Sequence, residues 1–232
     1  MSEVMRLLRI ILTAIACVSA AACDGRPQAR AAVRSEIRTG GHAQLLRSLI
    51  DPEKLATLGK RGANERIRRI TGILHEAKQA GHDPGSVARE AVALIGWEGT
   101  AKGDLTAAAM ERNVTIIGRL GSTTAEDIAS MRRGRAPTVR TGPYAGQILT
   151  VDHIIPRAVA PELDNVIANL ELMPLGLNQG KSDSVTERQT DLARKFHAAG
   201  LLSADGLQRV LSAASLSTRK AASRSSSSGP TR

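Results

Sequence analysis

One segment of the 232-residue chain, from Gln147 to Asp183, restricts the possible folds more than any other. Ile148 to Ile155 is largely β-branched and apolar and stops at a proline, which predicts a strand. Residues 157–168 hold turn-forming residues, including the Asp164-Asn165 pair, and predict a compact surface loop. Asn169 to Met173 then alternates polar and apolar residues, the pattern of a second short strand with one buried face.

The remainder of the segment predicts a helix. Leu177, Val185, Leu192 and Phe196 follow helical spacing from Leu175 onward, and the pattern ends near Gly200. The predicted order of elements is therefore strand, strand, helix.

Such a unit brings three chemically useful side chains together. Asp152 and His153 end the first strand and Asn178 lies in the first turn of the helix, so all three can converge on one point. A carboxylate and an amide oxygen are ligands that a hard cation such as Mg²⁺ accepts while it keeps several waters. The neutral imidazole of His153 is then available to take a proton from an attacking water.

These residues resemble the HNH, or ββα-metal, nuclease family in the pattern D-H-I-x-P from Asp152, N-L from Asn169 and N-x-x-K from Asn178. The resemblance covers about forty to fifty residues and implies a metal ligand at Asp152 and a general base at His153. It also implies a loop brace that orients the histidine at Asn169, a second metal ligand at Asn178, and a nucleic-acid contact at Lys181. The implied cofactor is Mg²⁺ or Mn²⁺, because both ligands are oxygen donors.

Each of these residues also has an ordinary structural interpretation. An Asp-His pair before a proline is common, Asn169 can serve only as a brace, and a lysine in a first helical turn is usually a solvated charge. The chain has no Cys-x-x-Cys pair, so no structural zinc is expected.

Other polar residues of the chain are expected at the surface. Glu171 alternates with Leu170 and Leu172, which predicts solvent exposure. The remaining histidines lack neighbouring acids at ligand spacing and are predicted to be surface residues: His42, His75, His82 and His197.

The charge of the chain suits a polyanionic partner. Its formal net charge is +10, and lysine and arginine gain affinity for nucleic acid by releasing counterions from phosphates. The predicted phosphate-contacting cluster, which could equally be an exposed helix end, is Arg132, Arg133, Arg135 and Arg140. Aromatic residues make up 1% of the chain, so base stacking is not expected as the binding mode.

Residues 1–23 have the pattern of a secretory signal peptide: basic residues, a short apolar run and small residues before Cys23. The end of this segment resembles a bacterial lipobox, which implies lipidation at Cys23 and attachment to a membrane. Ordinary cleavage after Ala22, or an uncleaved cytosolic helix, are the alternatives. The expected location is periplasmic or extracellular.

The rest of the chain divides into four parts: a helical region (24–135) that packs on the nuclease unit (136–200), a C-terminal helix (201–216) and a disordered basic, Ser-rich tail (217–232). In the helical region, the predicted helices span residues 43–60, with a break at Asp51-Pro52, 64–80, 86–97, 104–120, and 123–131 with a Thr123–Glu126 capping box.

The sequence therefore predicts an α+β fold, mostly helical, with a C-terminal ββα-metal unit. The expected function is an exported, metal-dependent HNH endonuclease that hydrolyses phosphodiester bonds of DNA with low sequence specificity. DNA is the expected partner, and RNA is a further candidate. A non-catalytic basic envelope protein that binds nucleic acid or another polyanion is the main alternative, and a structural lipoprotein is a third.

Overall fold

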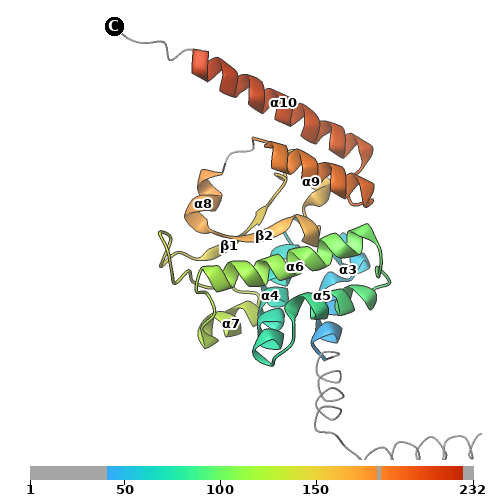
Figure 1. Cartoon of the computed structure of the whole chain (residues 1–232), viewed down its shortest axis with the longest axis vertical. Coiled ribbons are helices and arrows are strands. Elements are labelled where there is room, and N and C mark those ends of the chain that lie inside the picture. The colour runs from blue at the N-terminus through green and yellow to red at the C-terminus, as the bar shows by residue number, and fades with distance from the viewer. Residues whose placement is uncertain (1–40, 182–183, 227–232) are drawn as a thin grey trace, which may run out of the picture. The chain divides into compact units, whose positions relative to one another are not determined.

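The fold consists of helices arranged around one pair of short strands (Figure 1). The structure is a computed structural model that describes residues 41–181 and 184–226. The predicted signal peptide, Cys23 and residues 24–40 lie outside the described residues. Within the described part of the chain, no helix is long and apolar enough to cross a membrane.

The first half of the described chain is helical. Residues 41–50 form a helix, followed by α3 (Pro52–Ala56), α4 (Ala63–Gln79) and α5 (Pro84–Ala93). The predicted break at Asp51-Pro52 is confirmed, because the Asp51 carboxylate accepts the first amide hydrogen bonds of α3.

Two further helices complete the helical region, α6 (Ala101–Arg119) and α7 (Ala125–Arg132). The predicted capping box of the latter is wrong by one position. Thr124, whose backbone is extended, is the N-cap residue, and its hydroxyl accepts a hydrogen bond from the Asp127 amide.

The predicted order of strand, strand and helix is present. β1 (Leu149–His153) pairs antiparallel with β2 (Leu170–Pro174), and α8 (Leu175–Gly180) follows directly. The loop between the strands contains two short 3₁₀ turns, Pro161–Leu163 and Ile167–Asn169.

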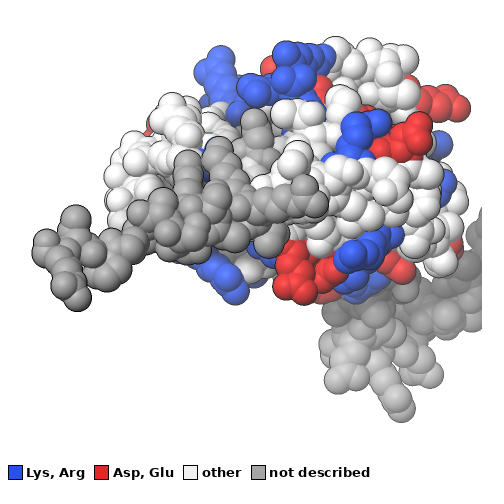
Figure 2. Space-filling view, turned by 90° about the horizontal axis from the view of Figure 1, so that it is seen from above, with Lys and Arg blue, Asp and Glu red and all other residues white. Residues whose placement is uncertain are grey.

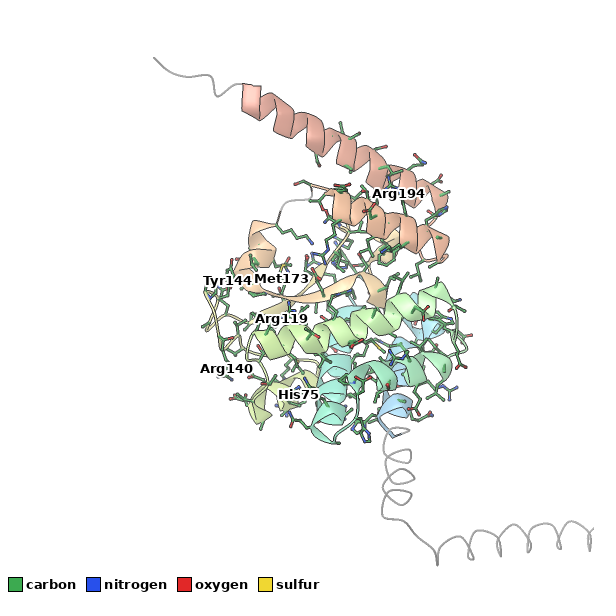
Figure 3. The ribbon with its side chains drawn as sticks, in the orientation of Figure 1. His75, Arg119, Arg140, Tyr144, Met173 and Arg194 are labelled. Carbon is green, nitrogen blue, oxygen red and sulfur yellow. The ribbon has the colours of Figure 1, made fainter. Side chains whose placement is uncertain are left out.

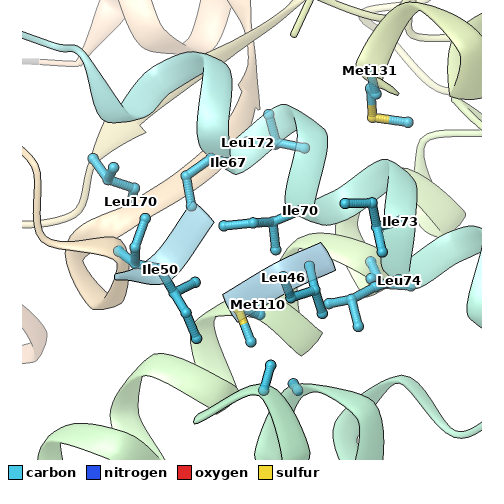
Figure 4. Close-up of a cluster of buried hydrophobic side chains, with 14 of the residues drawn as sticks. Leu46, Ile50, Ile67, Ile70, Ile73, Leu74, Met110, Met131, Leu170 and Leu172 are labelled. Carbon is cyan, nitrogen blue, oxygen red and sulfur yellow. The ribbon is translucent and has the colours of Figure 1, made fainter. Parts of the chain in front are cut away.

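The strand pair lies between two hydrophobic cores. Leu170 and Leu172 of β2 pack with Ile67 and Ile70 of α4 in the larger core (Figure 4). Beyond the strands, Phe196 belongs to the smaller core that α9 and α10 cover (Figure 1). Burial on both sides fixes the position of the strand ends, where the candidate site lies.

The C-terminal helices differ from the prediction. A single helix from Leu175 to Gly200 is wrong, because α8 ends at Gly180 and α9 (Glu187–Ala198) starts anew after Thr186. Thr186 and Gln189 form a capping box at this start. α10 (Ala204–Ser226) begins as predicted but extends through residues 217–226, so the predicted disorder is wrong there; residues 227–232 lie outside the described residues.

Several surface predictions also need correction. His75 and His82 are buried, with 7% and 9% exposure, and the His42 ring lies 6.0 Å from that of His82; only His197 is exposed as predicted. Glu171 is largely buried, and its carboxylate lies 3.6 Å from the Arg112 guanidinium.

Candidate functional site

The imidazole of His153 is held in one orientation at the end of β1. Its Nε2 lies 3.0 Å from the backbone carbonyl oxygen of Asp164. A carbonyl oxygen can only accept a hydrogen bond, so Nε2 carries the proton and Nδ1 keeps its lone pair. No group of the described residues hydrogen-bonds to Nδ1, which is therefore available as a base.

The Asp164 side chain adds negative charge beside the same ring. Its Oδ1 lies 3.0 Å from Nε2 of His153 but is not aligned as a hydrogen-bond acceptor. The carboxylate therefore acts on the ring through its negative charge and not through a hydrogen bond.

The loop that supplies Asp164 is anchored to the start of α4. Oδ2 of Asp164 accepts a hydrogen bond from the Arg61 amide at 3.0 Å, and Oδ1 of Asn165 accepts one from the Ala63 amide at 3.1 Å. Nδ2 of Asn165 donates to the Leu58 carbonyl oxygen at 3.2 Å. These bonds hold Arg61 in a left-handed conformation with φ of 58°, which is unfavourable for a residue other than glycine.

Asn169 fixes the bend that follows β1. Its Oδ1 accepts a hydrogen bond from the Ile155 amide at 2.8 Å, and its Nδ2 donates to the Ile155 carbonyl oxygen at 3.1 Å. The backbone oxygen of Asn169 also accepts the Ile154 amide hydrogen bond. Asn169 is fully buried and braces the loop, whereas Asp164, and not Asn169, contacts the histidine ring.

Asp152, Asn178 and Lys181 meet beside His153. The Lys181 ammonium donates to Oδ2 of Asp152 and, at 2.7 Å, to the His153 carbonyl oxygen. Nδ2 of Asn178 donates to the Thr150 hydroxyl at 2.8 Å. The amide oxygen of Asn178 has no hydrogen-bond partner among the described residues, so it is free to bind a cation.

These groups line a polar pocket of about 320 Å³ at the end of β1. Three cationic residues face one carboxylate in the lining, so the pocket is suited to an anionic group. The lining residues are Arg61, Asp152, His153, Pro156, Arg157, Ala158, Asn178 and Lys181.

The predicted arginine cluster is not part of this pocket. Arg132 pairs with Glu76 at 3.3 Å, and Arg140 makes two 3.1 Å hydrogen bonds to Asp127. Arg140 lies toward α7 in Figure 3, below the two strands. Arg133 and Arg135 are exposed but do not line the pocket.

The pair of Arg140 and Asp127 has a structural role. Burial alone would raise the pKa of Asp127, but hydrogen bonds from Arg140, Thr124 and the Thr138 amide outweigh it, so this pKa is lowered. Arg140 is therefore committed to an ion pair that ties the segment before β1 to α7.

The sequence did not identify three residues at the site. Asp164 was visible only as a turn residue, and Arg157 only as a member of the same loop. Arg61 lies more than 90 positions before them, and nothing in the sequence indicates that it meets the pocket. The hydrogen bonds from the Asp164-Asn165 turn bring this distant arginine to the site.

The oxygen atoms that the pocket offers as metal ligands fit a hard cation that is bound by few protein residues. Asp152 supplies a carboxylate and Asn178 a free amide oxygen, and the Lys181 ammonium already takes the place of a cation beside Asp152. Within the described chain, no group of three or more His, Cys, Asp or Glu residues could hold a metal. Any ion held here would depend on water and substrate for its remaining ligands.

Comparisons of the chain with models of protein families, with curated proteins and with solved structures find no match.

Proposed function

We propose that this chain is a metal-dependent endonuclease of the HNH type that hydrolyses phosphodiester bonds of DNA with low sequence specificity. The observation that carries the proposal is the state of His153, whose Nε2 is tied to the Asp164 carbonyl while Nδ1 remains available. A base in this state lies in the same pocket as two oxygen donors and three cationic residues.

In the proposed reaction, Nδ1 of His153 takes a proton from the attacking water. The water oxygen forms a bond to phosphorus, the bond to the leaving oxygen breaks, and that oxygen acquires a proton from solvent. The Asp164 carboxylate, 3.0 Å from Nε2, stabilises the positive charge that develops on the ring. General-base catalysis of this kind contributes roughly 10²–10⁴-fold to a rate.

Asp152 and Asn178 are the residues that would hold Mg²⁺ or Mn²⁺. When bound, the ion would polarise the scissile phosphate and stabilise negative charge on the leaving oxygen. Glu171 is not a candidate third ligand, because it is paired with Arg112.

Arg61 and Arg157 are suited to binding the phosphate of the substrate. Both line the pocket, and a guanidinium matches the geometry of phosphate oxygens. Contacts of this kind involve the backbone of the nucleic acid and carry no information about its bases. They support cleavage with low sequence specificity, and they would accept DNA or RNA.

The test is an incubation of the purified chain with supercoiled plasmid in Mg²⁺, Mn²⁺ or EDTA, beside its His153→Ala variant. We expect metal-dependent nicking by the wild type and a loss of roughly 10²–10⁴-fold in the variant. His197→Ala is the matched control, because His197 is exposed on α9 and does not line the pocket.

Plasmid that is retarded on a gel but uncut under every metal condition would contradict the proposal. That result would favour the alternative of a basic protein that binds polyanions without cleaving them. Export, and lipidation at Cys23, remain predictions from the sequence.

A further inference from the structure

The ammonium of Lys181 is bound as a small cation would be. A lysine ammonium has three N–H donors, and this one has three oxygen partners. They are Oδ2 of Asp152, the His153 carbonyl oxygen at 2.7 Å and the Ile154 carbonyl oxygen at 3.4 Å. The end of β1 therefore presents three oxygens to one positive charge.

The partner of this ammonium is the carboxylate proposed as a metal ligand. Asp152 is 8% exposed, and Lys181 is the one cationic residue of the described chain that pairs with it. A buried carboxylate without a counter-charge is unfavourable, so Lys181 stabilises the metal-free protein.

The same short helix carries the second proposed ligand and this counter-charge. Asn178 lies in α8, and Lys181 is the residue that caps the C-terminal end of this helix. The Lys181 amide donates a hydrogen bond to the Asn178 carbonyl oxygen. A divalent cation on Asp152 and Asn178 would lie close to the ammonium, and like charges at such a distance repel strongly. The long stem of lysine allows the ammonium to move away without a change in the helix.

We infer that Lys181 is a built-in counter-ion that a divalent cation displaces from Asp152, so that the chain binds metal more weakly than its ligands alone would allow. This inference rests on the proposed metal-dependent function. It assigns Lys181 a role in metal affinity instead of the direct nucleic-acid contact expected from the sequence.

Metal affinity without nucleic acid is the direct test. Mn²⁺ is titrated into wild type, Lys181→Met and Lys195→Met, and free Mn²⁺ is followed by electron paramagnetic resonance. Lys195 is an exposed lysine of α9 and serves as the matched control. We expect Lys181→Met to bind Mn²⁺ about tenfold more tightly than the wild type, because the Asp152 carboxylate is no longer neutralised by the ammonium. Lys195→Met should match the wild type.

The same variants test the metal-free protein. Lys181→Met should melt at a lower temperature than wild type in EDTA, and Mn²⁺ should raise its melting temperature more than it raises that of the wild type. Equal Mn²⁺ affinity in wild type and Lys181→Met overturns the inference and leaves the proposed nuclease intact. Absence of Mn²⁺ binding in both overturns the inference together with the proposed metal dependence.

A measurement on the wild type covers the case in which Lys181→Met does not fold. Lysines are acetylated with an N-hydroxysuccinimide ester, with and without Mn²⁺, and the modification of Lys181 relative to Lys195 is read by mass spectrometry. We expect Mn²⁺ to increase acetylation of Lys181, because displacement releases the ammonium from its three oxygen partners. Unchanged relative acetylation at saturating Mn²⁺ overturns the inference.

Discussion

Asp164 contacts two parts of the candidate site, the His153 ring and the Arg61 backbone. Its carbonyl oxygen fixes the tautomer of His153, its carboxylate lies beside the ring, and its Oδ2 accepts a hydrogen bond from the Arg61 amide. The proposed base and a proposed phosphate-binding residue thus share one anchor, although they lie far apart in the sequence.

The charge of Asp164 can be removed while its shape is kept. Asp164→Asn retains the backbone carbonyl and an oxygen for the Arg61 amide, but it loses the negative charge beside the His153 ring, which in the proposed reaction stabilises the charge that develops there. We expect the kcat of plasmid nicking to fall about tenfold. Asp191→Asn, at an exposed position of α9, is the control. A normal kcat in Asp164→Asn would show that the carbonyl alone is sufficient.

Asn169 and Asn178 should respond differently to the same substitution. Asn169→Ala leaves the buried Ile155 amide and carbonyl without partners, and we expect it to lower the free energy of unfolding by about 2–5 kcal/mol. Asn178→Ala loses one partly buried hydrogen bond to Thr150 and should cost about 1 kcal/mol while weakening Mn²⁺ binding. Urea unfolding and Mn²⁺ titration measure both effects; equal stability losses would contradict this division of roles.

At the scale of elements, the sequence predicted both strands to within two residues at each end, because apolar alternation and prolines mark them. It did not predict the end of α8, because helical spacing continues through Val185 to Phe196 and both residues are buried in the smaller core. The Thr186–Gln189 capping box was present in the sequence and marks the start of α9. Periodicity alone cannot distinguish one long helix from two that bury the same face.

The contacts of the candidate site were harder to predict than its elements. Asp152, His153 and Asn178 were placed together correctly, because they end a strand and begin the next helix. The approach of Arg61 and the charge partners of Arg132 and Arg140 depend on tertiary packing. Such contacts cannot be predicted from the residues that are neighbours in the sequence.

Within α4, the buried His75 should make the stability of the folded protein depend on pH. Burial, followed by the nearby Lys78 charge, lowers the pKa of His75 from its ordinary value of 6.5, and Glu76 only partly opposes this. The folded protein therefore takes up the proton less readily than the unfolded chain. The stability that neutral His75 contributes is complete above about pH 6.5 and is lost as the pH falls toward the lowered pKa.

His75→Leu should remove this dependence. We expect the urea midpoint of the wild type to fall between pH 7.5 and pH 5 by more than that of the variant. His197→Gln, which changes an exposed histidine, should follow the wild type. Parallel pH profiles for wild type and His75→Leu would refute the assignment to His75.

At the scale of the whole molecule, the face that Figure 2 shows carries lysine and arginine in separate groups with acidic residues among them, and not in a single basic patch. Several arginines that look available in the sequence are paired with carboxylates, as Arg112 is with Glu171. The net charge of +10 favours attraction of a polyanion in general, whereas the pocket at β1 is the place where we propose that a phosphate reacts.

The helical region and the strand pair should unfold together, because Asn113 of α6 joins them. This fully buried side chain donates to the Leu170 carbonyl oxygen at 3.2 Å and accepts from the Leu172 amide at 2.7 Å. Asn113→Ala leaves the Leu172 amide without its partner, while the Leu170 carbonyl oxygen keeps a hydrogen bond from Arg112 at 3.2 Å, and we expect a loss of about 1–3 kcal/mol in the free energy of unfolding. Asn64→Ala is the control, because the buried Asn64 amide oxygen has no hydrogen-bond partner, so its removal should be nearly neutral.

Amide hydrogen exchange read by mass spectrometry can locate the effect of Asn113→Ala. We expect peptides from α4 and peptides from β1 and β2 to lose protection by the same free energy, because both regions exchange through one global opening. Faster exchange confined to the strand peptides would mean that the strand pair opens on its own. The helices would then be a support for the candidate site but not part of its cooperative unit, and the stability of the site would have to come from its contacts with α8, α9 and α10.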